Sequence, residues 1–98
     1  VTKRIQEEYE KLLKEVGEEG FYSHILSTAV LARKHYDHPE ITMIEQGEAF
    51  FSLFRTTGNE NFFIVGRILR RAAHKLYRDS RYKDPEYPAN KRFLDIIK

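Results

Sequence analysis

The clearest chemistry in the sequence is offered by a row of basic side chains in segment 60–81. On the helix predicted for this segment, they fall on one side or at its edge: Arg67, Arg70, Arg71, His74, Lys75, Arg78 and Arg81. Cations in such a row displace counterions from a phosphate backbone. The row therefore predicts non-specific binding of nucleic acid or of another acidic partner. The alternative is a solvated face that pairs with acidic residues of segment 2–16.

Base-specific DNA recognition is not expected, although segments 42–55 and 60–81 have the outline of a helix-turn-helix. A recognition helix contacts bases mainly through its N-terminal residues. Here the N-terminal residues are mostly apolar: Glu60, Asn61, Phe62, Phe63 and Ile64. The basic residues come later in the segment.

A second set of residues predicts a contact with another protein. These large apolar side chains lie off the expected buried faces or in the C-terminal tail: Leu53, Phe63, Ile64, Phe93, Leu94, Ile96 and Ile97. Exposed apolar patches of this kind mark interfaces, and a two-fold dimer is the commonest way to bury them. Burial within the chain's own core remains the alternative.

Catalytic, metal and cofactor sites are not expected. His35 and His38 flank Asp37, but a usable metal site needs three or four converging ligands. The sequence has no phosphate-binding loop, dinucleotide-binding fingerprint or nucleophile elbow. Its carboxylate pairs occupy polar positions, where a raised pKa suitable for general acid catalysis is not expected. We therefore predict that the protein is not an enzyme.

Composition narrows the class of protein further. The 98 residues include no cysteine, and the net charge of +2 divides unevenly along the chain. Residues 1–61 hold 7 Lys/Arg and 11 Asp/Glu, and residues 62–98 hold 10 and 4. The longest aliphatic or aromatic run is four residues, whereas a membrane span needs about 20. We expect one cytoplasmic domain with no membrane segment.

The elements that would position these residues are helices. Hydrophobic residues recur with helical spacing in segments 2–16, 22–36, 42–55 and 60–81, and no segment shows sustained strand alternation. In segment 60–81 the apolar stripe consists of Phe62, Val65, Leu69, Ala72 and Leu76. Gly17 and Gly20 are expected to end the first helix.

These segments predict an all-α fold, a bundle of four main helices. Residues 1–98 would form a single domain, with the bundle in 1–81. Residues 82–98 would form an arm, which contains Pro85 and Pro88 and ends in a short apolar helix. The leading functional hypothesis is a homo-oligomeric protein-interaction module. The alternative is nucleic-acid or acidic-partner binding through the basic row.

Overall fold

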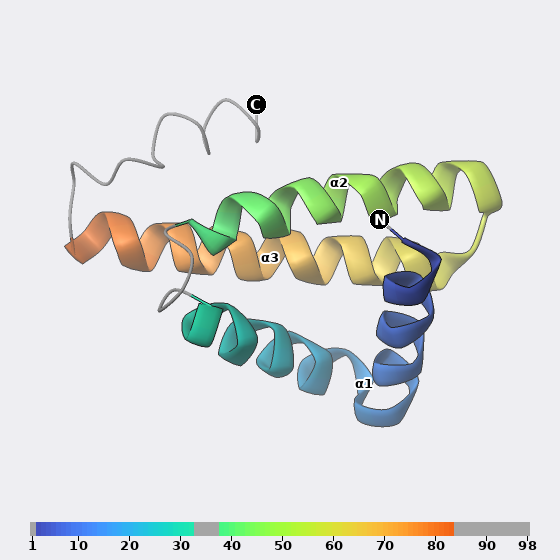
Figure 1. The fold of residues 1–98 in the computed structure, drawn as a ribbon, viewed down its shortest axis with the longest axis horizontal. Helices are drawn as coiled ribbons and strands as arrows, with labels where there is room; N and C mark the ends of the chain where they lie inside the picture. Colours follow the sequence, from blue (N-terminus) through green and yellow to red (C-terminus); the bar gives the residue numbers. More distant parts are fainter. Residues whose placement is uncertain (1, 33–37, 84–98) are drawn as a thin grey trace.

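The protein is all-α, as the hydrophobic pattern predicts. The computed structural model describes residues 2–32 and 38–83, with side chains described as far as Asp79 (Figure 1). These residues form three helices, α1 (Lys3–Ala32), α2 (Pro39–Thr57) and α3 (Glu60–Lys83), and they contain no strand. Within the same ranges, no helix is long and apolar enough to cross a membrane.

The prediction of a bundle of four main helices is wrong, because the described parts of the first two predicted segments, residues 3–16 and 22–32, belong to one bent helix, α1. Gly17 has φ 74° and ψ 179°, a conformation that is accessible almost only to glycine. The backbone on both sides of Gly17 is helical, so the chain bends without a loop. In Figure 1 the N-terminal half of α1 runs across the other helices, whereas its C-terminal half runs beside α3.

The predicted arm and short helix fall mostly outside the described residues. Residues 82 and 83 belong to the end of α3 instead of to an arm. Residues 84–98 are not described, so the predicted helix near the C-terminus is not tested. Gly17 does interrupt the helical backbone, as expected, but Gly20 does not, since α1 continues through this residue.

α2 and α3 form an antiparallel hairpin around a two-residue turn. Gly58 ends α2 in the left-handed conformation (φ 73°), and its N–H donates to the Phe54 carbonyl at 2.7 Å. The Asn59 side-chain oxygen then accepts from the Asn61 N–H at 3.0 Å, which caps α3. The Asn59 amide nitrogen also donates to Glu10 at 3.0 Å and so ties the turn to α1.

The two helices of the hairpin approach most closely where Gly47 faces Gly66. A Cβ added to Gly47 would lie 3.1 Å from the Gly66 carbonyl oxygen. A Cβ added to Gly66 would lie 3.0 Å from the Gly47 carbonyl oxygen and from the Phe51 ring. The two backbones therefore approach closely here, and a side chain at either position would require its neighbours to shift by a few tenths of an ångström.

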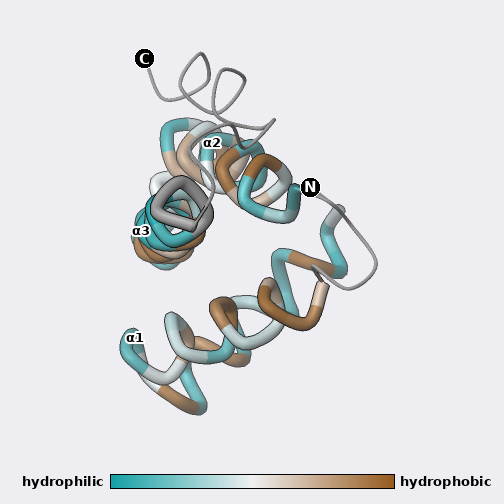
Figure 2. Tube along the Cα trace, turned by 90° about the vertical axis from the view of Figure 1, so that its left-hand side faces the viewer, coloured by the Kyte–Doolittle hydropathy of each residue, from teal (hydrophilic) through white to brown (hydrophobic). Residues whose placement is uncertain are grey.

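The core lies between this hairpin and α1. The stripe predicted for α3 is confirmed, since all five members are buried: Phe62, Val65, Leu69, Ala72 and Leu76. From the C-terminal half of α1, Phe21, Ile25 and Ala29 add the buried face expected of residues four apart. Figure 2 shows α2 and α3 adjacent, whereas α1 diverges from α2 and packs mainly on α3.

An aromatic cluster holds the N-terminal half of α1 in place. The Tyr9 ring stacks on Phe50 at 5.7 Å between centroids and meets Phe21 edge-on at 5.5 Å. Tyr9 precedes the bend and Phe21 follows it, so the cluster bridges both halves of α1. Such aromatic pairs stabilise the fold by more than the burial of their apolar surface alone.

Replacing Gly66 with alanine tests the helix contact. Alanine favours a helix over glycine by about 1 kcal/mol, so propensity alone predicts higher stability. We expect the opposite, a net loss of about 1–3 kcal/mol in the free energy of unfolding, because the new methyl group meets backbone. Urea denaturation followed by circular dichroism measures the change. Ser27→Ala, on the exposed face of α1, is the control without a clash. Unchanged or higher stability in Gly66→Ala would show that the helices can separate at no penalty.

Candidate functional site

Five of the seven basic candidates surround one hollow on the outer face of α3. The hollow has a volume of about 390 Å³ and is lined by Arg67, Arg70, Arg71, His74 and Arg78. We call it the arginine hollow. Because α3 is a straight amphipathic helix, the side opposite its buried stripe carries all five side chains. Lys75 is exposed and pairs with Asp79 at 3.3 Å. The side chain of Arg81 lies outside the described part of the chain.

Three of these arginines form ion pairs with acidic residues of the other helices. Arg67 pairs with Glu18, and Arg71 with Glu19 at 3.2 Å. Both glutamates directly follow the bend in α1. On the other side of the hollow, Arg70 pairs with Glu48 of α2 at 3.1 Å. All these groups are substantially exposed, and exposed ion pairs contribute little net stability.

The electrostatic environment of the hollow acts on His74. Partial burial lowers its pKa first, and the charges of Arg70 and Arg78 lower it further. The imidazole is therefore more strongly biased toward its neutral form than an exposed histidine.

Of the apolar interface candidates, the structure describes Leu53, Phe63 and Ile64. Leu53 and Ile64 are partly buried and pack against the core. Phe63 is 42% exposed. It packs on Phe54 and Phe51 of α2, with ring centroids 5.3 and 5.7 Å away. The tail candidates fall in the part of the chain that is not described: Phe93, Leu94, Ile96 and Ile97.

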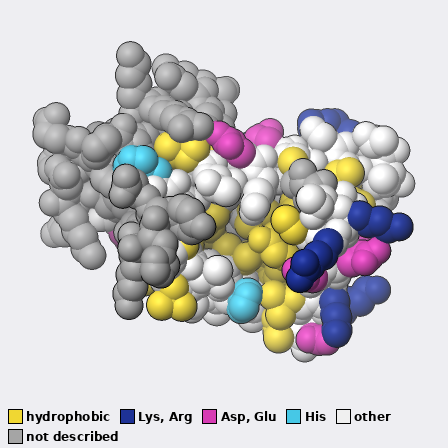
Figure 3. Space-filling view, in the orientation of Figure 1, with side chains coloured by type: hydrophobic (Ala, Val, Ile, Leu, Met, Phe, Trp, Pro, Cys, Tyr) yellow, Lys and Arg dark blue, Asp and Glu magenta, His cyan; other side chains and the backbone are white. Residues whose placement is uncertain are grey.

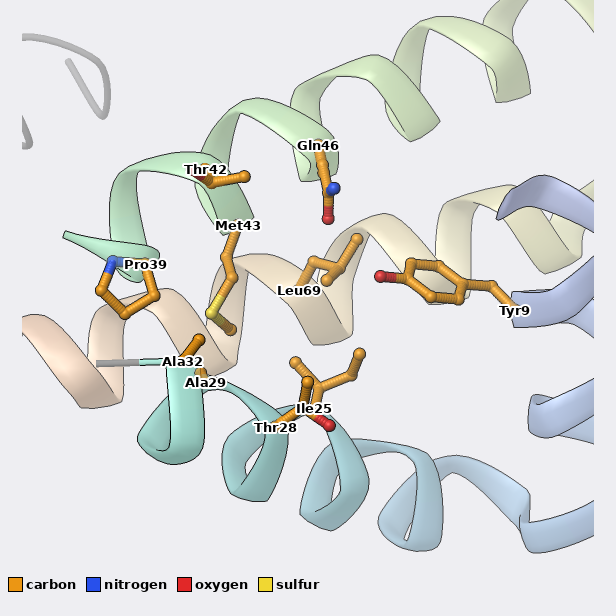
Figure 4. A pocket seen from close by; sticks show the side chains of 10 residues that line it. All are labelled: Tyr9, Ile25, Thr28, Ala29, Ala32, Pro39, Thr42, Met43, Gln46 and Leu69. Carbon is orange, nitrogen blue, oxygen red and sulfur yellow. The ribbon is translucent and has the colours of Figure 1, made fainter. Parts of the chain in front are cut away.

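An open apolar groove lies between the C-terminal half of α1 and α2, and the sequence did not predict it. Its cavity measures about 310 Å³ (Figure 4). Ile25 and Ala29 line one wall, Met43 and Gln46 the other, and Leu69 of α3 lies between them. Figure 3 shows hydrophobic side chains gathered over this part of the surface. A cavity of this size with an apolar lining is typical of binding sites.

Tyr9 adds a polar group to one end of the apolar groove. Its hydroxyl points toward Leu69 in Figure 4. Burial, and then the nearby Glu8 carboxylate, raises the pKa of Tyr9. The hydroxyl therefore stays protonated at neutral pH and can donate a hydrogen bond to an occupant of the groove.

Glu40 is a buried carboxylate that the sequence also did not single out. It lies in the first turn of α2 with a fully buried side chain, and its Oε1 is 4.0 Å from Nδ1 of His38. The N-terminal turn of a helix stabilises negative charge, which fits a glutamate at this position. Within residues 2–32 and 38–83, no three His, Asp or Glu side chains gather in a way that could hold a metal ion.

Comparison of the chain with protein-family models, curated proteins and solved structures yields no match. The apolar groove and the arginine hollow are therefore the two surfaces from which a function can be inferred.

The lowered pKa of His74 predicts a pH-dependent part of the stability. As pH falls below the usual value of 6.5, the unfolded chain takes up this proton before the folded chain does. The free energy of unfolding therefore decreases as the pH is lowered. His74→Gln removes the part of this decrease that comes from His74. Urea denaturation at several pH values between about 7.5 and 5.5 compares wild type, His74→Gln and the exposed control His24→Gln. Parallel curves for wild type and His74→Gln would contradict the prediction.

Proposed function

We propose that the protein is a protein-interaction module that binds an amphipathic helix in the apolar groove, and that a second copy of the chain supplies this helix. The observation that carries the proposal is the open groove itself. Apolar grooves between helices accept the apolar face of another helix, whose side chains recur every three or four residues.

The C-terminal half of α1 offers the complementary surface. Val30 and Leu31 are 54% and 59% exposed, although they belong to the helix that forms one wall of the groove. In a two-fold dimer the same surface contacts itself, so each copy would present this apolar edge to the groove of the other. One contact would then bury both the groove and the exposed residues.

Variants at the rim of the groove test this proposal. Thr28 and Thr42 lie on opposite walls and are exposed, so arginine at either position should obstruct the groove and leave the core intact. Leu31→Glu removes the complementary apolar side chain. We expect each change to weaken dimerisation about tenfold or more, since charge at the centre of an interface is strongly unfavourable. Sedimentation equilibrium over a range of concentrations measures the dimer dissociation constant.

Thr56→Arg is the matched control, because this exposed residue near the C-terminal end of α2 lies ten residues beyond Gln46, the last residue of α2 that lines the groove. It should dimerise like wild type, and circular dichroism should show that every variant is folded. A wild-type chain that remains monomeric at all concentrations would refute self-association. A dimer that tolerates arginine at both rim positions would place the interface elsewhere.

A further inference from the structure

The arginine hollow lies on the outer face of α3, apart from the apolar groove, and continues along the helix to an exposed aromatic ring. Phe63 precedes Arg67 by one turn on the same face. The stretch from Phe63 to Arg78 covers about 22 Å of helix at 1.5 Å per residue. None of the described side chains that line the hollow is acidic or apolar. The surface therefore combines closely spaced cations with one aromatic group at its end.

The Phe63 ring is held in position by its neighbours. Phe51 and Phe54 pack against it, and the Arg67 guanidinium lies 6.0 Å from its centroid. A second cation of the row, Arg71, lies 3.9 Å from the centroid of the Tyr22 ring. Ordering these groups for a ligand therefore requires little further loss of side-chain freedom.

The ion pairs of the hollow allow an anion that binds the arginines more tightly to replace the glutamates. Glu18 and Glu19 each engage one guanidinium through an exposed contact. Among the described residues, Arg78 makes no ion pair. A chain of phosphates can contact several cations of the row at once, which single carboxylates cannot do.

Among polyanions, a single strand of nucleic acid fits this surface best. It presents phosphates at regular intervals and bases that can stack on an exposed ring. A duplex keeps its base faces stacked inside, so Phe63 would have no role. A helix entering a major groove would also lead with its N-terminal turn, where Glu60 is acidic.

We propose that the arginine hollow and Phe63 bind single-stranded nucleic acid, with phosphates on the arginines and one base on the Phe63 ring. Glu18 and Glu19 hold Arg67 and Arg71 in place and compete with the phosphates. This site is independent of the apolar groove and of self-association.

Fluorescence anisotropy with a labelled oligouridine of about 12 nucleotides, at low and moderate salt, tests the proposal. Each phosphate contact on a single strand contributes about −0.7 to the slope of log affinity against log salt. Arg71→Gln with Arg78→Gln should weaken binding tenfold or more and reduce the magnitude of the slope by about 1.4. Lys14→Gln with Arg55→Gln removes two exposed positive charges elsewhere and should change neither quantity by a comparable amount.

Two further comparisons separate stacking and competition from overall charge. Phe63→Ala should weaken binding about tenfold without changing the salt slope, and Phe63→Tyr should restore it. Glu18→Gln with Glu19→Gln should tighten binding more than the matched pair Glu7→Gln with Glu15→Gln, which neutralises exposed carboxylates of the N-terminal half of α1.

Three outcomes would overturn the proposal. Absence of binding at low salt would remove the site. Equal affinity for a duplex of the same length, with no effect of Phe63→Ala, would make the hollow a general polyanion surface. Competition by inorganic tripolyphosphate at the same phosphate concentration, as strong as that by unlabelled oligouridine, would show that the sugar and base contribute nothing.

Discussion

The backbones of α2 and α3 touch where Gly47 faces Gly66, and this contact determines the arrangement of the surfaces around it. With both positions free of side chains, the helices approach until each carbonyl oxygen lies only 3.0–3.1 Å from where a Cβ of the other glycine would be. The rest of the hairpin then has little freedom to rotate, because a turn of either helix would carry a side chain into this contact.

The consequence for the hairpin is a separation of aromatic residues between its two sides. Phe50 and Phe62 meet at 5.8 Å, and both are buried in the core beneath α1. Their sequence neighbours Phe51 and Phe63 meet at 5.7 Å toward the outer face. Adjacent residues on a helix differ by about 100° in direction, so one helix pair can support a core on one side and an accessible ring on the other.

The bend in α1 links these two sides. Before the bend, Tyr9 reaches the end of the apolar groove. After it, Glu18 and Glu19 reach the arginines on the outer face of α3. One glycine conformation therefore positions groups that belong to different surfaces, although neither surface contains the glycine itself.

The sequence predicts those features that depend on local periodicity. The buried stripe of α3 and the basic face opposite it follow from spacings of three and four residues, and the structure contains both. Spacing could not predict that helical backbone follows directly after Gly17, because a glycine in a polar stretch usually ends a helix. Here Phe21 and Ile25 pack on the core immediately afterwards, so tertiary contacts favour a second helical half over a loop. The apolar groove depends on how far α1 diverges from α2, which no local pattern encodes.

Because the bend contains no loop, the rotational position of the residues before it determines that of the residues after it. A flexible linker can accommodate an inserted or deleted residue without rotating the helix that follows. At Gly17, by contrast, the helical backbone resumes at the next residue. One extra residue between this bend and Phe21 would rotate everything that follows in α1 by about 100°. Ile25 and Ala29 would then leave α3, and polar residues would take their places. The number of residues between Gly17 and Phe21 is thus under a constraint as strict as that on the buried residues that follow.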